Sequence, residues 1–469
     1  MNNLPYNRVE KDSIIAFAKK LIGKSIKSEF GEELNDLNLS NRDKGQLGKV
    51  IEELYFKYKP NSDSNADFNE AGLELKSSGL KKLKKSKEYR AKERLVLNII
   101  NYIELLDKNF EDDFLEGKNS HLLLIFYLYE KGLNQLSSII KLVGDWKFPE
   151  EDIPILKNDW QIIYNKVKNG LAHELSEGDT FYLGACTKGG KGGNHRDQPN
   201  SEIKAKQRAY SLKPGYLNHI ISNISQEEHS IYGKILTQET IFEHLPSIEE
   251  IVISKFEPYY GKTSIEIEDH FNLELNRKAK SYFANLTKAI LGIGLNMKIE
   301  EFEKADIQVK TIRLKENNLP KEHVSFRNFK YEEIVKLDWE KSDFKHILEQ
   351  KFFIVFYQFE DGVLILRSVK FWNMPYSDIL EAKQVWEKTV KTINKGKIIR
   401  EITDKGVRKT YFPKKTESRI SHVRPHARDK NDVYSLPYKD KLTGLTEYTK
   451  HCFWLNDTYI RDNIYAIQK

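Results

Sequence analysis

Two acidic residues and a lysine stand close together in one short stretch of the sequence. Asp67 lies seven residues before Glu74, and Lys76 follows Glu74 by two positions. Residues two apart in a strand share one face, so Glu74 and Lys76 would point the same way. Two converging carboxylates suit a hard cation such as Mg²⁺, which prefers oxygen ligands. A cation held there could lower the pKa of its bound water and stabilise charge on a phosphate.

Lys76 has two interpretations in this chemistry. As a general base it would need a pKa lowered by roughly three units from about 10.4. We expect the simpler role, in which Lys76 orients the nucleophilic water and neutralises developing charge. The alternative without any chemistry is an ordinary Glu–Lys pair on an exposed strand, because 31% of the chain is charged.

Mixed α and β elements are predicted to position these residues. One helix would begin at Ser13 and end at Gly23, and a second would begin near Asp43 and reach Tyr58. The apolar run at 122–128 predicts a central strand buried on both faces. This strand is expected to span 122–129, and the further elements are a helix at 158–170 and strands at 73–76 and 180–185. We therefore expect an α/β domain with a central mixed sheet.

The sequence repeats itself after about 230 residues. Five segments recur in the same order, which chance explains poorly. The pairs are 17–39 and 255–275, 74–76 and 308–310, 122–127 and 352–357, Trp160 and Trp386, and 210–212 and 453–455. The repeat predicts two copies of one domain, at 1–224 and 241–469, joined by a polar linker at 225–240.

Upstream of the acidic pair, residues 41–52 read NRDKGQLGKVIE. Together with D-x₆-E-L-K at 67–76, this block resembles the MutH-like nucleases, and the resemblance extends from Ser13 to Tyr210. It implies tandem restriction-endonuclease-like domains of the PD-(D/E)xK kind. It also implies a type II restriction endonuclease that cuts double-stranded DNA at GATC, uses Mg²⁺ and leaves 5′-phosphates.

The resemblance assigns roles to individual residues of the first copy. The implied metal ligands are Asp67, Glu74 and Glu52; the catalytic lysine is Lys76; and Lys44 and Lys118 lie near the phosphate. The alignment around Lys118 is looser, so a plain surface lysine is the alternative there.

Base-reading residues are expected in two later segments, a glycine-rich loop at 187–196 and an aromatic segment at 208–213. A glycine-rich loop can approach a groove closely and offer donors to guanine. The alternative is a mobile loop that contacts phosphates only. The residues predicted to contact DNA are Lys188, Lys191, Arg196, Tyr210 and Lys213.

In the second copy the acidic pair has degenerated. Gln308 stands where Glu74 stands in the first copy, and a neutral amide removes one ligand charge. Glu301 keeps the first acidic place, and Asp306 is a candidate replacement ligand. We expect this copy to have lost catalysis and to bind DNA as an allosteric effector, through residues that include Arg419 and Arg424. The alternative is a scaffold that stabilises or dimerises the enzyme.

Bulk composition agrees with a soluble DNA-binding protein. The net charge of +7 fits a polyanionic partner, and two cysteines are too few for a disulfide framework. No apolar run is long enough to span a bilayer, and the first residues lack a secretory signal, so we expect a cytoplasmic protein. We also expect that it needs no obligate protein partner. DNA bound at two sites could pair two protein molecules.

The competing functions are a mismatch-repair-type nicking endonuclease and a catalytically silent DNA-binding protein.

Overall fold

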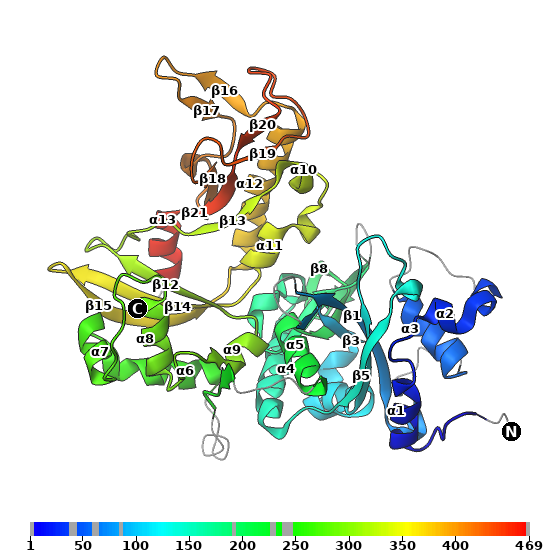
Figure 1. Ribbon diagram of the computed structural model, residues 1–469. Helices are drawn as coiled ribbons and strands as arrows, with labels where there is room; N and C mark the ends of the chain where they lie inside the picture. Colours follow the sequence, from blue (N-terminus) through cyan, green and yellow to red (C-terminus); the bar gives the residue numbers. More distant parts are fainter. Residues whose placement is uncertain are drawn as a thin grey trace. The chain divides into compact units, whose positions relative to one another are not determined.

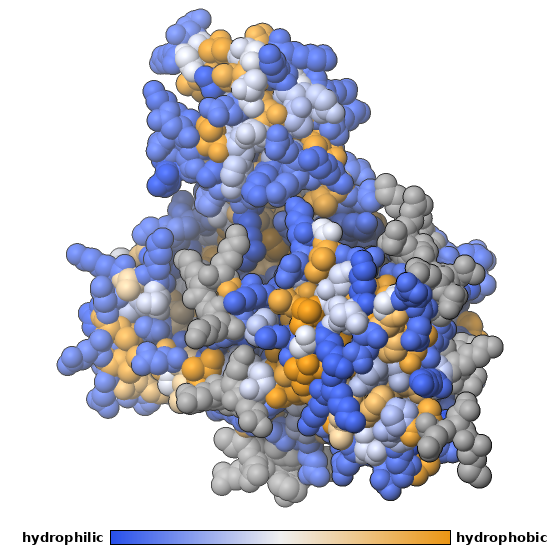
Figure 2. Space-filling view, turned by 45° about the vertical axis from the view of Figure 1, so that its right-hand side comes forward, coloured by the Kyte–Doolittle hydropathy of each residue, from blue (hydrophilic) through white to orange (hydrophobic). Residues whose placement is uncertain are grey.

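The computed structural model describes residues 4–36, 45–58, 65–83, 88–189, 194–225, 231–236 and 247–465. Tertiary contacts divide the chain into two units (Figure 1). Unit 1 comprises residues 1–248 and 296–306, and unit 2 comprises residues 249–295 and 307–469. Hydrophilic side chains cover most of the face drawn in Figure 2. Within the described ranges, no helix has the length and apolar character that a membrane crossing requires.

Unit 1 combines helices with short and long strands. Its helices are α1 (Lys11–Lys19), α2 (Ile26–Phe30), α3 (Gln46–Val50), α4 (Ile153–Lys168), α5 (Pro214–Ile224) and α9 (Glu300–Lys304). Its strands are β1 (Glu74–Lys82), β2 (Tyr89–Ala91), β3 (Leu95–Ile99), β4 (Leu122–Leu128), β5 (Ile140–Trp146), β6 (Leu183–Thr187), β7 (His195–Gln198), β8 (Ser201–Lys206), β9 (Arg208–Leu212), β10 (Tyr232–Gly233) and β11 (Lys298–Ile299).

The main sheet of unit 1 has the strand order β2-β1-β4-β5. Strands β1 and β4 run parallel, while the β1–β2 and β4–β5 pairs are antiparallel, so the sheet is mixed as expected. The first six residues of β4 are buried, in agreement with the predicted central strand. A second, antiparallel sheet has the order β3-β9-β6.

Two helix predictions differ from the structure in their boundaries. Helix α1 begins at Lys11, because the hydroxyl of Ser13 does not cap it and instead accepts a hydrogen bond from the amide of Asn7 at 2.8 Å. The second predicted helix is described from Gln46, and after Val50 it continues as a π-helical segment over Ile51–Tyr55. Both helices bury apolar side chains against the main sheet of unit 1.

The predicted strand at 180–185 begins later, at Leu183. The carboxylate of Asp159, which is fully buried on α4, accepts hydrogen bonds from the amides of Phe181, Tyr182 and Leu183 at 2.6 to 2.9 Å. These amides are therefore bonded to a side chain rather than to a neighbouring strand.

Unit 2 contains a second set of helices and strands. Its helices are α6 (Ile248–Phe256), α7 (Ser264–His270), α8 (Tyr282–Ile290), α10 (Tyr331–Ile334), α11 (Asp343–Leu348), α12 (Tyr376–Asn394) and α13 (Asp457–Tyr459). Its strands are β12 (Gln308–Leu314), β13 (Ser325–Phe329), β14 (Phe352–Glu360), β15 (Val363–Trp372), β16 (Ile399–Ile402), β17 (Arg408–Thr410), β18 (Ser421–Pro425), β19 (Val433–Ser435), β20 (Glu447–Thr449) and β21 (His451–Leu455).

The sheets of unit 2 repeat those of unit 1. The order β12-β14-β15, parallel and then antiparallel, corresponds to β1-β4-β5. The order β13-β21-β18 corresponds to β3-β9-β6. In register, Gln308 pairs with Phe352 as Glu74 pairs with Leu122. The predicted tandem duplication of a mixed α/β domain is confirmed, while the domain boundaries at 225–240 stay a prediction.

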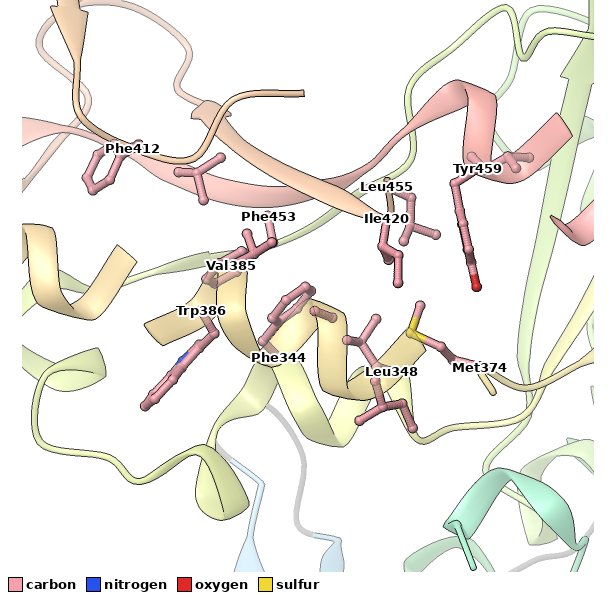
Figure 3. Close-up of a cluster of buried hydrophobic side chains, with 14 of the residues drawn as sticks. Phe344, Leu348, Met374, Val385, Trp386, Phe412, Ile420, Phe453, Leu455 and Tyr459 are labelled. Atoms are coloured by element: carbon pink, nitrogen blue, oxygen red, sulfur yellow. The ribbon is translucent and has the colours of Figure 1, made fainter. Parts of the chain in front are cut away.

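The core of unit 2 is rich in aromatic side chains. Figure 3 shows Phe344 from α11, Trp386 from α12 and Phe453 from β21 in one buried cluster. The rings of Phe344 and Phe453 are stacked with their centroids 4.0 Å apart. This cluster joins α11 and α12 to the sheet that contains β18 and β21.

Candidate active site

A tight turn brings the two predicted carboxylates of unit 1 together. Asn69–Ala71 form a 3₁₀ turn, and Gly72 follows with a left-handed φ of 58°. A bridge between Phe68 and Leu73 closes this turn. A left-handed residue is favourable for glycine because glycine lacks a Cβ. The turn therefore returns the chain so that Asp67 lies beside the start of β1.

Backbone amides hold the carboxylates of Asp67 and Glu74. The amide of Asp67 donates to Glu74 Oε2 at 3.1 Å, and the amide of Leu75 donates to Asp67 Oδ2 at 2.9 Å. Glu74 is 2% exposed. A buried carboxylate is stable only when hydrogen bonds and charges surround it, and both are present here.

Two lysines approach the second oxygen of Glu74. Lys76 Nζ donates to Glu74 Oε1 at 2.5 Å, and Lys118 Nζ lies 4.0 Å from the same oxygen. Lys118 belongs to the 3₁₀ turn Gly117–Asn119 just before β4. The parallel pairing of β1 with β4 starts here, since the amide of Glu74 donates to the carbonyl of His121 at 3.0 Å. The structure thus brings Lys118 to the site that the loose alignment indicated.

Glu52 completes an acidic group. It lies in the π-helical segment, and burial together with the charge of Asp67 raises its pKa to about 7. Burial and the charge of Glu74 likewise raise the pKa of Asp67 to about 6. A Cβ on Gly48 would lie in ordinary contact with Ser77 Oγ at 3.5 Å and with Glu52 Oε1 at 3.9 Å, so this glycine lies beside the carboxylate.

Sequence reasoning missed Tyr58 as a member of this site. Its hydroxyl is buried and has no hydrogen-bond partner among the described residues. Burial, followed by the charges of Asp67, Glu52 and Glu74, raises its pKa. The sequence predicts Tyr58 only as the end of the second helix, and it carries no signal that the hydroxyl lies near the acidic group.

The donor set suits a hard divalent cation. Oxygen ligands with negative charge are what Mg²⁺ prefers, and a bound dication would relieve the repulsion that raises the pKa values of Asp67 and Glu52. In the part of the chain that the structure describes, no three acidic, histidine or cysteine side chains lie close enough together to hold a metal ion as they stand. Lys76 instead contacts Glu74 directly.

The structure describes only some of the residues predicted to lie near the phosphate or to contact DNA. Lys44 and Lys191, one near the phosphate and one in the glycine-rich loop, lie outside the described residues. Lys188 is partly exposed at the end of β6, and Arg196 is exposed on β7. Both side chains are placed where a nucleic acid could reach them, and their contacts with DNA stay a prediction.

Tyr210 and Lys213 require a correction. Tyr210 is fully buried, and its hydroxyl donates to Asp113 Oδ2 at 2.7 Å, an oxygen that also accepts from Trp160 Nε1 at 2.8 Å. Lys213 is 4% exposed, and its ammonium donates to the carbonyl of Thr180. Buried side chains that are bonded inside the fold do not reach a base, so we assign both residues structural roles.

The acidic residues of the second copy are occupied by other contacts. Glu301 Oε1 accepts from the amides of Ile235 and Leu236 at 2.8 and 2.9 Å. Asp306 has a left-handed φ of 53° ahead of β12, so it does not share the strand alternation of Gln308. Its carboxylate accepts from the amide of Gly215 at 2.8 Å. Neither residue restores the ligand that Gln308 lacks.

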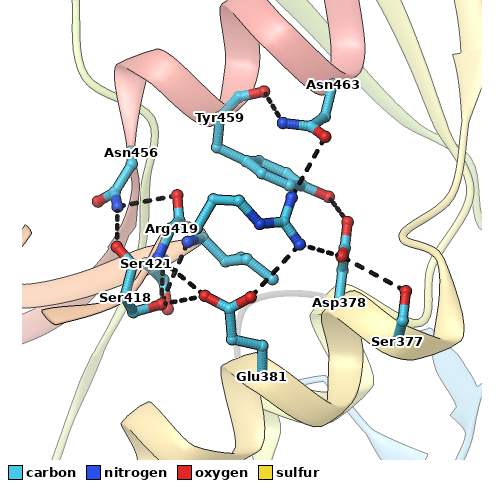
Figure 4. A network of polar contacts seen from close by, with 10 residues as sticks. Ser377, Asp378, Glu381, Ser418, Arg419, Ser421, Asn456, Tyr459 and Asn463 are labelled. Atoms are coloured by element: carbon cyan, nitrogen blue, oxygen red, sulfur yellow. Dashed lines mark hydrogen bonds and ion pairs between the residues drawn. The ribbon is translucent and has the colours of Figure 1, made fainter.

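The two arginines predicted to contact DNA in unit 2 differ in their surroundings. The guanidinium of Arg419 is bonded to Asp378, Glu381 and Asn463 and lies against the ring of Tyr459 (Figure 4). This network joins the segment before β18 to α12, which is a structural role. Arg424 is partly exposed and stacks 4.1 Å from the ring centroid of Trp454.

Comparisons with known proteins agree with this geometry. A family model described as the DNA mismatch repair enzyme MutH matches residues 56–159 and 292–390. The first segment contains Asp67, Glu74 and Lys76, and the second contains their degenerate counterparts. The chain is also 36% identical to the type II restriction enzyme Sau3AI of Staphylococcus aureus, in an alignment that covers 97% of this chain and 98% of the relative.

Proposed function

This chain belongs to the MutH family of nucleases, and we propose that it is a type II restriction endonuclease that cuts double-stranded DNA at GATC. The observation that carries the proposal is the convergence of Asp67, Glu74, Glu52 and Lys76 at the start of β1. The recognition sequence is inferred from the family resemblance. The similarity to a restriction enzyme over nearly the whole chain supports the activity.

Asp67 and Glu74, with Glu52 as a third acidic group, would hold a Mg²⁺ ion. When bound, Mg²⁺ supplies a water of lowered pKa and positive charge beside the phosphate. The protein's own contribution is to fix the carboxylates: the amides of Asp67 and Leu75 hold one oxygen of Glu74 and one oxygen of Asp67 before any ligand arrives. Preorganised charge of this kind needs no rearrangement during the reaction.

Lys76 and Lys118 supply positive charge on the same side of Glu74. We assign Lys76 the task of orienting the attacking water and neutralising charge on the phosphate. Water attacks the phosphorus atom, the bond to the 3′ oxygen breaks, and the products are a 5′-phosphate and a 3′-hydroxyl. Burial and the neighbouring carboxylates raise the pKa of Glu52 to about 7, so a bound cation would favour the charged form of this carboxyl.

One active site cuts one strand at a time. A double-strand break therefore requires two copies of unit 1 to pair on the DNA, or two successive nicks. We assign unit 2 the role of a DNA-binding effector, because Gln308 replaces a ligand while exposed basic residues remain. A mismatch-repair-type nicking enzyme is the second candidate function, and the retained second copy argues against it.

Digestion of unmethylated plasmid by the purified protein, with and without Mg²⁺, tests the proposal. The expected result is Mg²⁺-dependent double-strand cutting, with every sequenced end at GATC. Nicked circles alone would support the repair-type enzyme. Intact plasmid that the protein nevertheless retards in a gel would show a DNA-binding protein without catalysis.

A further inference from the structure

Unit 2 contains a hairpin that has no counterpart in the described connection from α4 to β6 of unit 1. In both units a long helix leads to an edge strand of the second sheet: α4 leads to β6, and α12 leads to β18. Only two short 3₁₀ turns, Ala172–Glu174 and Glu177–Asp179, are described between α4 and β6. The connection from α12 to β18 is longer and forms the antiparallel hairpin of β16 and β17. We call residues 397–411 the basic arm.

The charge of this connection differs sharply between the copies. Residues 395–415 contain eight lysines and arginines and two acidic residues. The corresponding residues 169–182 of the first copy contain no lysine or arginine and three acidic residues. The chain as a whole has a net charge of only +7, so the arm region holds much of its basic excess.

The base of the basic arm is fixed to the core of unit 2. Ile398 and Ile399 are buried, and their amides donate to Asp440 Oδ2 at 2.9 and 3.0 Å. Phe412 is buried just after the arm and packs parallel to the ring of Tyr331. The ribbon is therefore presented on a rigid base rather than on a long unanchored loop.

Most of the rest of the basic arm is exposed. Arg400, Lys405 and Arg408 are all exposed. Among the described residues, the ion pairs of the arm join Arg400 and Lys409 to Glu401, and none involves Lys405 or Arg408. Ile402 and Val407 near the turn are 50% and 58% exposed, and Ile402 pairs with Arg408 across the hairpin. At the top of Figure 2, over the end of unit 2 that carries β16 and β17, hydrophobic patches lie among hydrophilic atoms.

We propose that the basic arm is a β-ribbon that binds duplex DNA. Arg400, Lys405 and Arg408 contact backbone phosphates, and Ile402 and Val407 contact the surface of a groove. The major groove admits a two-stranded ribbon, and apolar side chains at such a tip can pack against sugars and bases. This inference rests on the proposed function in that it identifies the part of unit 2 that meets DNA.

The test measures duplex affinity against salt concentration, using the full chain with Lys76→Ala so that DNA stays uncut. The arm variant carries Arg400→Gln, Lys405→Gln and Arg408→Gln. The matched control carries Lys278→Gln, Lys280→Gln and Lys336→Gln, which removes the same charge from exposed positions of unit 2. Each phosphate contact contributes about 0.9 to the slope of log K against log salt, so losing three lowers the slope by about 2 to 3.

We expect the arm variant to show this reduction in slope and to bind the duplex at least about tenfold more weakly at 0.1 M salt, while the control variant changes little. Ile402→Ser with Val407→Ser should weaken binding without changing the slope. Equal losses of affinity in the arm and control variants would overturn the arm assignment, because net charge alone would then explain the binding. Unchanged binding of the arm variant would overturn the arm alone, whereas absence of duplex binding by the Lys76→Ala chain itself would overturn the proposed function as well.

Discussion

The backbone amide of Asp67 donates a hydrogen bond to Glu74 Oε2, and the strand that carries Glu74 returns a hydrogen bond to Asp67 through the amide of Leu75. Each carboxylate is thus positioned by the chain segment of the other. Glu74 Oε2 and Asp67 Oδ2 accept these backbone hydrogen bonds, so the second oxygen of each carboxylate is left for charged partners. On Glu74 that partner is Lys76.

Replacing Lys76 by alanine should abolish most cleavage while leaving DNA binding nearly intact. Removing one preorganised charge from an active site typically lowers kcat by about 10² to 10³. Single-turnover cleavage and gel-shift affinity on one GATC duplex measure the two quantities. Lys118→Ala is the matched control and should cost less, because its Nζ lies 4.0 Å from Glu74 Oε1. Equal loss of cleavage and binding in Lys76→Ala would contradict the assigned role.

Glu74→Gln should remove cation binding and cleavage without unfolding unit 1. Glutamine keeps an oxygen that can accept the amide of Asp67 but lacks the charge, and it is the residue that the second copy carries at Gln308. The stabilisation that Mg²⁺ or Ca²⁺ gives in thermal melting should disappear. Adding Gln308→Glu to this variant should not restore cleavage, because Glu301 accepts two backbone amides. Restored cleavage would show a working second site.

Local sequence patterns predicted the elements around Glu74 well. The alternation of 73–76 and the apolar run of β4 each depend on neighbours in the sequence. Burial of a polar side chain depends instead on long-range packing. Tyr210 and Lys213 stand in a basic aromatic segment that resembles a DNA-binding surface, yet they pair with Asp113 and the carbonyl of Thr180 inside the fold.

The place of residues 296–306 could not be predicted for the same reason. The repeat assigns them to the second copy, but their contacts lie in unit 1. Lys304 is 3% exposed there, between two carboxylates: its ammonium lies 3.0 Å from Asp152 Oδ1 and 2.9 Å from Glu300 Oε1. A repeat in the sequence shows which segments share an ancestor, not which segments pack together.

Tyr210→Phe should lower the stability of unit 1 and leave DNA affinity unchanged. The substitution removes the hydroxyl that donates to buried Asp113, which typically costs about 1 to 3 kcal/mol when the acceptor is charged. Urea unfolding and duplex affinity measure the two effects. Arg196→Ala is the contrast, since its exposed side chain is predicted to affect affinity and not stability. A loss of affinity in Tyr210→Phe at unchanged stability would restore the DNA-reading role.

A fragment that ends at residue 248 should be markedly less stable than one that ends at residue 306. The shorter fragment lacks Lys304 and so leaves Asp152 buried without its cation, a loss that typically costs about 3 to 5 kcal/mol. Thermal melting of both fragments measures the difference. Lys304→Met in the longer fragment should reproduce most of the loss. Equal melting temperatures would support the boundary expected at 225–240.

Unit 2 should lose stability as the solution is acidified below pH 6.5, and His451 accounts for part of this loss. The ring is 1% exposed and its N–H donates to the carbonyl of Thr449 at 2.7 Å. Burial lowers the pKa of His451 to about 4, whereas an unfolded chain has a histidine pKa of about 6.5.

Between these two pKa values the unfolded chain binds a proton that the folded unit does not bind, so stability rises with pH across this window. The shift corresponds to about 3 kcal/mol, fully present above pH 6.5 and lost near pH 4. Urea unfolding of the wild type and of His451→Gln, from pH 4.5 to 7, checks this: the difference between the two proteins should grow with pH. A constant difference across the range would show that His451 titrates alike in both states.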